Sequence, residues 1–313
     1  MAEEGARDAD QPVEPAADED DVRSGVWCET GSARAAIAAA IGASVDQLDR
    51  ELPRARSGHD PEGVHQARVA TRRLRSDLRT YGPLLDEPWR DTTRAELEWL
   101  ADALGAVRDA DVLGLRLAEA FAVVGVAADA AATISARLGD QRDTARTRLS
   151  EVLDTPRTAA LLNELRRSAV DPPTTLSALG RAELRLRPLV RRPWRKLSRA
   201  VGRLGTEPTA AELHRVRLLA KRTRYAAEAV VGVYGRDTRR FASAVQQVQD
   251  VLGDMNDAQV AIAWLRDAAT DLDPSTAFAA GELAHHFQGV ADAHRHGWER
   301  AFARARKRSR WLD

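Results

Sequence analysis

Apolar residues recur at spacings of three and four along nearly the whole chain, from about Gly31 onward. This spacing places them on one face of an α-helix, and the abundance of Ala, Leu and Arg favours helices as well. No stretch shows the strict alternation of apolar and polar residues that is typical of a strand. The pattern therefore predicts an all-α protein.

Glycine and proline residues divide this pattern into helix-sized pieces, because both residue types end helices. The predicted breaks are Gly58 to Pro61, Gly82 to Pro88, Gly105, Gly125, Asp171 to Pro173, Gly205 to Pro208, Gly235, Gly253 and Asp273-Pro274.

Two motifs occur twice, in the same order. His65-x2-Arg68-x3-Arg72-Arg73-x-Arg75 recurs 149 positions later as His214-x2-Arg217-x3-Lys221-Arg222-x-Arg224. Leu104-Gly105-x3-Asp109-Ala110 recurs 148 positions later as Leu252-Gly253-x3-Asp257-Ala258. Two motifs that repeat in the same order at nearly the same offset indicate a duplication. We predict two related antiparallel bundles of the four-helix type with internal pseudo-twofold symmetry, at about 31–153 and 176–313, joined by 154–175.

The first 24 residues differ from the rest of the chain. They hold nine acidic residues and two arginines, and without aromatic residues or apolar periodicity they predict a disordered acidic tail. The whole chain has zero net charge, so the part after the tail is basic, and only three of its cations are lysines. Arginine is the side chain that grips phosphate with two parallel hydrogen bonds.

Cys28 is the single cysteine, which excludes an internal disulfide and a cysteine-based zinc site. No apolar run approaches the roughly 20 residues that span a bilayer, and the N-terminus is acidic where a signal peptide is basic. We expect a cytoplasmic protein without a membrane association.

The first copy of the arginine motif places its cations on one helix face. At about 100° per residue, His65, Arg68, Arg72, Arg75 and Arg79 fall within a narrow sector, opposite an apolar stripe. In the second copy His214, Arg217, Lys221 and Arg224 share the same angles, whereas Glu228 stands where Arg79 would recur.

Stacked cations at these spacings repel one another, each close pair costing a few tenths of a kcal/mol. Either carboxylates of neighbouring helices or an anionic ligand must offset this repulsion. A protonated histidine donates from both ring nitrogens, so His65 and His214 are candidates to add charge beside phosphates. Local capping or packing is the alternative for each.

Asp109 and Asp257 follow a Leu-Gly pair that is expected to end one helix, so N-capping is their first interpretation. An ion pair with an arginine such as Arg68 or Arg217 is the second. Further exposed cations of the second half are expected to widen the basic surface: Arg195, Lys196, Arg199 and Arg203, with Arg50 at the position equivalent to Arg199.

The end of the chain adds two weaker features. Arg304-x-Arg306-Lys307-Arg308-x-Arg310 is a basic run that a solvated tail would explain. The histidines near it, His285, His286, His294 and His296, lack acidic or cysteine ligands at a standard spacing, so we predict no metal site and no cofactor.

The two repeated motifs resemble the CHAD family, the conserved-histidine α-helical domain. The first motif reads Val64-His65-Gln66-Ala67-Arg68-Val69-Ala70-Thr71-Arg72-Arg73-Leu74-Arg75, and Leu-Gly-x3-Asp follows it downstream. The resemblance covers about 280 residues. It implies two helical bundles related by a pseudo-twofold, a basic surface or central pore that binds inorganic polyphosphate, and an association with polyphosphate granules in some members.

The resemblance also implies the contact residues. These are His65, Arg68, Arg72, Arg73, Arg75, Arg79, His214, Arg217, Lys221, Arg222 and Arg224. The Glu-x-Glu-x-Lys strand that marks the CYTH triphosphatase domain of many relatives does not occur in this chain.

We therefore predict a polyphosphate-binding protein that is not an enzyme. Three alternatives stay open: nucleic-acid or other polyanion binding through the same arginines, a metal-dependent phosphoanhydride hydrolase, and a structural bundle with internally paired arginines. The sequence shows no clustered carboxylates beside the basic faces. It leaves both a monomer and a homodimer open.

Overall fold

The protein is described from a computed structural model that covers residues 31–58 and 60–313. Within these ranges it contains α-helices and short 3-10 turns and no β-strand. The all-α prediction is therefore confirmed. The predicted acidic tail and Cys28 lie outside the described residues.

The helices follow one another in two comparable series. The first half comprises α1 (Ala33–Ser57), α2 (Pro61–Thr80), α3 (Glu87–Val124), α4 (Ala128–Leu153) and α5 (Pro156–Val170). The second comprises α6 (Ala182–Val201), α7 (Ala210–Ala229), the single turn α8 (Val231–Tyr234), α9 (Arg236–Ala268), α10 (Pro274–Ala293) and α11 (Trp298–Arg308). The predicted joining segment at 154–175 thus contains a helix, α5, which packs against α1.

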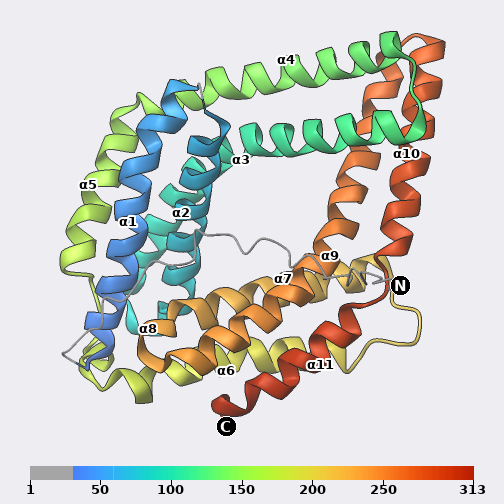
Figure 1. Cartoon of the computed structure of the whole chain (residues 1–313). Helices are drawn as coiled ribbons and strands as arrows, with labels where there is room; N and C mark the ends of the chain where they lie inside the picture. The colour runs from blue at the N-terminus through green and yellow to red at the C-terminus, as the bar shows by residue number, and fades with distance from the viewer. Residues whose placement is uncertain (1–30, 59) are drawn as a thin grey trace, which may run out of the picture.

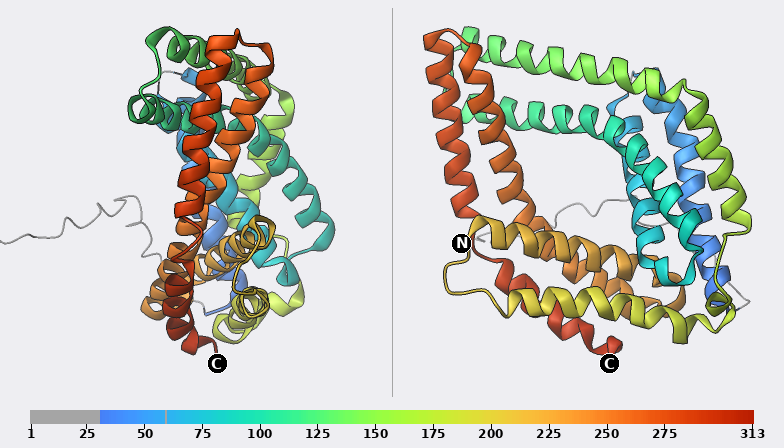
Figure 2. Two further views of the ribbon diagram at one scale, coloured as in Figure 1. Left: turned by 90° about the vertical axis from the view of Figure 1, so that its right-hand side faces the viewer. Right: turned by 180° about the vertical axis from the view of Figure 1, so that it is seen from behind.

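The helices run along the four sides of a frame (Figure 1). Helices α1, α2 and α5 form one side and α6, α7 and α11 an adjoining one. The long helices α3 and α9 each bend from one side to the next, where they pair with α4 and α10 respectively (Figure 2). Each half therefore makes two sides of the frame instead of one straight bundle.

The first four helices of the chain correspond to α6, α7, α9 and α10 of the second half. The packing of α1 on α2, α2 on α3 and α3 on α4 recurs as α6 on α7, α7 on α9 and α9 on α10. The halves meet at two opposite corners, where α2 contacts α7 and where α10 contacts α3 and α4. A pseudo-twofold axis through these two contacts relates the halves.

Most predicted breaks coincide with helix ends, because the residues there cap helices. Gly58 and Gly125 adopt a left-handed backbone after α1 and α3, and the side chain of Asp273 accepts from the first turn of α10. The breaks predicted at Gly105 and Gly253 are wrong, since α3 and α9 continue through both. A glycine inside a helix costs only about 1 kcal/mol relative to alanine, which packing readily offsets.

Candidate anion-binding seam between α2 and α7

The helices that carry the two arginine motifs pack against each other across the pseudo-twofold. The hydroxyl of Tyr81, directly after α2, donates to the carbonyl oxygen of Ala229 at the end of α7, and Tyr81 is fully buried. We refer to the surface along this contact as the seam. Apolar residues on the opposite sides, among them Ala67, Leu74 and Val216, are buried as the helical pattern predicts.

Five cations from the two helices gather at the seam. Lys221 on α7 has four guanidinium groups as charged neighbours, those of Arg72, Arg217, Arg68 and Arg224. All five side chains are half-buried. We call this set the central cluster. The structure thus brings together residues that are about 150 positions apart in the chain.

Burial and mutual repulsion make these charges expensive. The pKa of Lys221 is lowered to about 8, first by burial and then by the neighbouring arginines. The pKa of Arg72 is also lowered, mainly by burial. Arg224 and Arg68 lower it further, whereas Tyr225 and Glu228 oppose the shift. In the free protein the central cluster is therefore an electrostatically strained array of positive charge.

The members of the central cluster differ in how their charge is balanced. Arg68 forms an ion pair with Asp109 at 3.1 Å, and Arg224 pairs with Glu228 at 2.8 Å on its own helix. Three further cations, Arg72, Arg217 and Lys221, form no ion pair with a carboxylate in the described part of the chain. The buried Nε atoms of Arg72 and Arg217 also lack a hydrogen-bond partner there.

The aromatic ring of Tyr225 contacts one arginine of the central cluster from each of the two helices. The Arg72 guanidinium lies 5.6 Å from the centre of the Tyr225 ring, and the Arg224 guanidinium lies 4.9 Å from it. Tyr225 is itself buried. Contact with an aromatic face stabilises a cation by about 0.5–2 kcal/mol, which offsets part of the repulsion.

The remaining cations of the two motifs form a second group further along the seam. Arg79 has Arg94, Arg222 and Arg75 as positively charged neighbours and Glu98 as a negatively charged one, and Glu98 in turn pairs with Arg75. Partial burial and these neighbours lower the pKa of Arg79. The single face predicted for α2 is thus divided between the central cluster and this second group.

Two acidic residues, Asp77 on α2 and Glu228 on α7, lie among these cations. Burial raises the pKa of Asp77 to about 8 although Arg73 opposes the shift, and Glu228, the acidic residue at the position of Arg79, raises it further. A carboxyl with a pKa of about 8 is mostly protonated at pH 7, so Asp77 balances little of the positive charge of its neighbours.

The histidine of the second motif has a defined partner. His214 is exposed, and its Nδ1 atom lies 3.0 Å from Oδ1 of Asn256 on α9. Because the amide oxygen of Asn256 can only accept, Nδ1 of His214 donates this hydrogen bond, and Nε2 is not part of it. His65 is half-buried on α2.

The two aspartates after the Leu-Gly pairs have unequal roles. Neither caps a helix, because both lie inside α3 or α9, so the capping interpretation is wrong. The ion pair of Asp109 with Arg68 confirms the alternative for the first repeat. Asp257, in contrast, binds Arg116 of α3 at 3.0 Å, together with Asp254 at 3.2 Å, and not Arg217.

Gly105 explains why a glycine stands inside α3. A Cβ atom at this position would lie 2.5 Å from Nη1 of Arg68, so a larger residue would force the guanidinium to shift from its position beside Asp109. At the equivalent Gly253 a Cβ atom would meet nothing within 4 Å. The repeated Leu-Gly motif thus has a demonstrable contact function in the first half alone.

Carboxylates lie closer to the cations than the sequence indicated. Asp109 contacts Arg68, and Asp250 has Arg224 and Asp254 as charged neighbours, while burial raises its pKa. Within the described residues no group of three or more His, Cys, Asp or Glu side chains is arranged to hold a metal ion. The Nε2 atom of His294 lies 3.7 Å from Oδ2 of Asp254.

The cations of the α6 region lie outside these groups. Arg195, Lys196 and Arg199 are exposed on α6, which runs along the outer edge of the frame beyond α7 (Figure 1), and Arg203 follows the helix. None of them is among the charged neighbours of Arg72, Arg79 or Lys221. That they widen the basic surface stays a prediction.

Sequence reasoning missed four residues that shape the site. They are Tyr225, Arg94, Arg116 and Asn256. Only Asn256 gave a signal, because it directly precedes the repeated Asp257. The others come from helix positions whose neighbours across the fold no local spacing reveals.

Fold and seam together define a duplicated all-α protein whose two equivalent helices join their cationic faces. The family model of the CHAD domain matches residues 39–266, so the chain belongs to the CHAD domain family. A comparison with curated proteins gives no match. None of the described helices has the length and apolar character needed to cross a membrane.

Two solved structures share this fold. The CHAD domain of the plant Ricinus communis is 26% identical, with a TM-score of 0.72 over 88% of this chain and 92% of that one. PptA from Streptomyces chartreusis is 24% identical, with a TM-score of 0.74 over 87% of this chain and 99% of that one.

Proposed function

We propose that the seam binds inorganic polyphosphate, and that the protein acts as a binding module without catalysis. The observation that carries the proposal is the presence of three half-buried cations, Arg72, Arg217 and Lys221, without a carboxylate partner in the described ranges. A cluster of this kind is costly unless an anion is bound. The link of the CHAD family to polyphosphate supports this choice of anion.

Polyphosphate suits the seam for two physical reasons. It carries a negative charge on every phosphate, and arginine forks and an ammonium group hold such oxygens by charge-assisted hydrogen bonds. Contacts with successive phosphates of one chain also act together, so affinity rises with chain length. Protonated His214 would add a donor through Nε2, since Nδ1 is already bound to Asn256.

In this proposal the paired cations position the unpaired ones. Asp109 holds the guanidinium of Arg68 in place, and the Tyr225 ring contacts the guanidinium groups of both Arg72 and Arg224. A ligand therefore meets a largely preformed array, which reduces the entropic cost of binding. Association with polyphosphate granules and a cytoplasmic location are part of the same proposal.

The test is a titration with long-chain polyphosphate at two salt concentrations. We compare the wild type with the seam variant Arg72→Gln/Arg217→Gln/Lys221→Gln, which leaves no orphaned carboxylate and should fold. Strong, salt-sensitive binding that the folded seam variant loses is expected. Equal binding by both proteins would contradict the proposal.

Two further arms separate the alternatives. Duplex DNA that displaces polyphosphate at equal phosphate concentration would favour nucleic acid as the ligand, because phosphate contacts alone do not distinguish the two. Release of inorganic phosphate from polyphosphate with magnesium or manganese present would contradict the absence of catalysis. Replacement of Arg195, Lys196 and Arg199 with glutamine tests whether the α6 cations widen the surface.

A further inference from the structure

A second concentration of cations lies between α9 and α11, formed by residues other than those of the seam. Helix α11 packs on the fold through Trp298, Ala301, Phe302 and Ala305, which are buried, and its opposite face carries the basic run at the end of the chain. Between α11 and α9 is a cleft of about 660 Å³. Its lining residues are Arg239, Arg240, Ser243, Ala244, Gln247, Arg304, Lys307 and Arg308.

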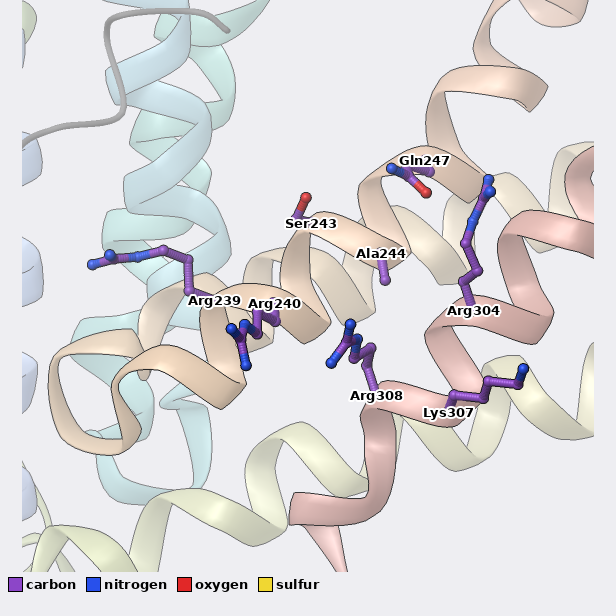
Figure 3. Close-up of a pocket in the computed structure, with 8 residues that line it drawn as sticks. All are labelled: Arg239, Arg240, Ser243, Ala244, Gln247, Arg304, Lys307 and Arg308. Carbon is purple, nitrogen blue, oxygen red and sulfur yellow. The ribbon is translucent and has the colours of Figure 1, made fainter.

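Side chains from both helices line the cleft (Figure 3). Arg240 of α9 lies across from Arg308 of α11, which extends toward α9, and Arg304 ends beside Gln247, whereas Arg239 and Lys307 point away from the space between the helices. Ser243 adds a neutral hydroxyl, and no carboxylate of the described residues lines the cleft. The basic run that a solvated tail would explain is thus a helix face opposed by further arginines.

A comparison with α5 shows that this arrangement is not the ordinary state of arginines in this protein. Helix α5 follows α4 as α11 follows α10, and its three arginines are all paired: Arg157 with Glu96, Arg166 with Asp49 and Arg167 with Glu164. The arginines and lysine that line the α9–α11 cleft form no ion pair within the described chain.

The unpaired charges repel one another. Arg304 and Arg308 stand at i and i+4 on α11, a spacing at which like charges destabilise a helix. A structural role for these arginines would place carboxylates beside them, as on α5. The cleft instead offers guanidinium groups, an ammonium group and neutral donors, and these are the groups that bind phosphate oxygens.

We propose that the α9–α11 cleft is a second anion site that binds a short run of phosphates, either as a free oligophosphate or as part of a longer polyphosphate chain. The choice of a phosphate chain as the ligand rests on the proposed function, whereas the site does not share a residue with the central cluster. A chain that engages both sites gains affinity from the second contact without any new interaction at the first.

The experiment is a calorimetric titration with tripolyphosphate, which is too short to bind the seam and the cleft at the same time. The cleft variant is Arg240→Gln/Arg304→Gln/Arg308→Gln. Its charge-matched control is Arg300→Gln/Arg306→Gln/Arg310→Gln, which removes three exposed cations of the same region that do not line the cleft. Each set is introduced into the wild type and into the seam variant, and circular dichroism verifies folding.

In the seam variant we expect residual tripolyphosphate binding that the cleft substitutions weaken about tenfold or more, whereas the control changes it less than twofold. Equal effects of the cleft and control sets would overturn the proposal, because they would indicate general charge attraction. Displacement of tripolyphosphate from the cleft by duplex DNA at equal phosphate concentration would overturn the ligand class.

Long-chain polyphosphate separates this inference from the proposed function. Binding that depends on the seam substitutions and not on the cleft substitutions in any background would refute the cleft and leave the proposed function standing. Binding that depends on the cleft alone would support the cleft and refute the seam as the main site.

Discussion

The arginines of α5 and those of the seam show two uses of the same side chain. On α5 each guanidinium has a carboxylate partner, and Arg157 in addition lies 4.1 Å above the Trp99 ring. At the seam Arg72 and Arg217 have buried Nε atoms without a partner in the described ranges. In a chain with 47 basic residues, the balance of each charge therefore identifies a candidate site better than the number of charges does.

The largest expected difference concerns ligand affinity. The seam variant should bind long-chain polyphosphate about 100-fold or more weakly than the wild type, because three charge-assisted contacts are lost. The matched α5 variant, Arg157→Gln/Arg166→Gln/Arg167→Gln, removes the same charge and should stay within about threefold. Fluorescence anisotropy at constant salt measures both. Similar losses would mean that net charge and not the seam governs binding.

Stability should respond in the opposite way. Arg157→Ala removes a two-point contact with Glu96, with distances of 2.6 and 3.1 Å, and the stacking on Trp99. Since Arg157 is half exposed, we expect only a small fall in the free energy of unfolding. Arg72→Gln should leave that free energy unchanged or raise it, because repulsion is relieved. Urea denaturation without ligand provides the comparison.

The pH dependence should distinguish Lys221 from its arginine neighbours. Its folded-state pKa of about 8 lies below the ordinary value, so charged Lys221 destabilises the free protein below pH 8. The free energy of unfolding should therefore rise between pH 8 and about pH 10 as the folded state releases this proton. Polyphosphate affinity should fall about three- to tenfold between pH 7 and pH 9, since binding requires the charged form.

Lys221→Arg is the control for this titration, because an arginine keeps its charge throughout the range. The variant should bind with an affinity that is nearly constant between pH 7 and pH 9. If wild type and variant show the same slope, a group other than Lys221 titrates.

The smallest expected effect compares the two Leu-Gly motifs. Gly105→Ala places a Cβ atom against the Arg68 guanidinium and should weaken polyphosphate binding about two- to fivefold by displacing it from Asp109. Gly253→Ala has open space around it, so affinity should not change and the helix should gain up to about 1 kcal/mol. An equal change in polyphosphate affinity for the two variants would show that binding does not depend on the position of the Arg68 guanidinium.

Local patterns were sufficient to predict the elements and the cationic faces. Helical spacing and repetition identified α2 and α7, and the pairing of Asp109 with Arg68 was among the two interpretations of that aspartate. The bends of α3 and α9 were not predictable in this way, because they depend on which helices pack on each half of a long helix (Figure 2). The break predicted at Gly105 was wrong for the same reason, since its neighbour Arg68 comes from another helix.

The charge balance at the seam was also beyond local reasoning. Arg116 of the first half forms ion pairs with Asp257 and Asp254 of the second half, and the Tyr225 ring contacts the guanidinium of Arg72. Equivalent positions of the two repeats have diverged in these contacts. A repeat detected in sequence thus predicts where side chains emerge but not which partners they meet.

The pseudo-twofold relation of α2 and α7 has a consequence for how a polymer is read. The two helices place cations at equivalent positions, Arg68 with Arg217 and Arg72 with Lys221, although Glu228 stands where Arg79 would recur. A linear polyphosphate has identical ends and no direction along its backbone, whereas a nucleic-acid strand runs from 5′ to 3′. If the seam binds polyphosphate as proposed, both orientations of the chain therefore give the same complex, whereas a nucleic-acid strand would form two different ones.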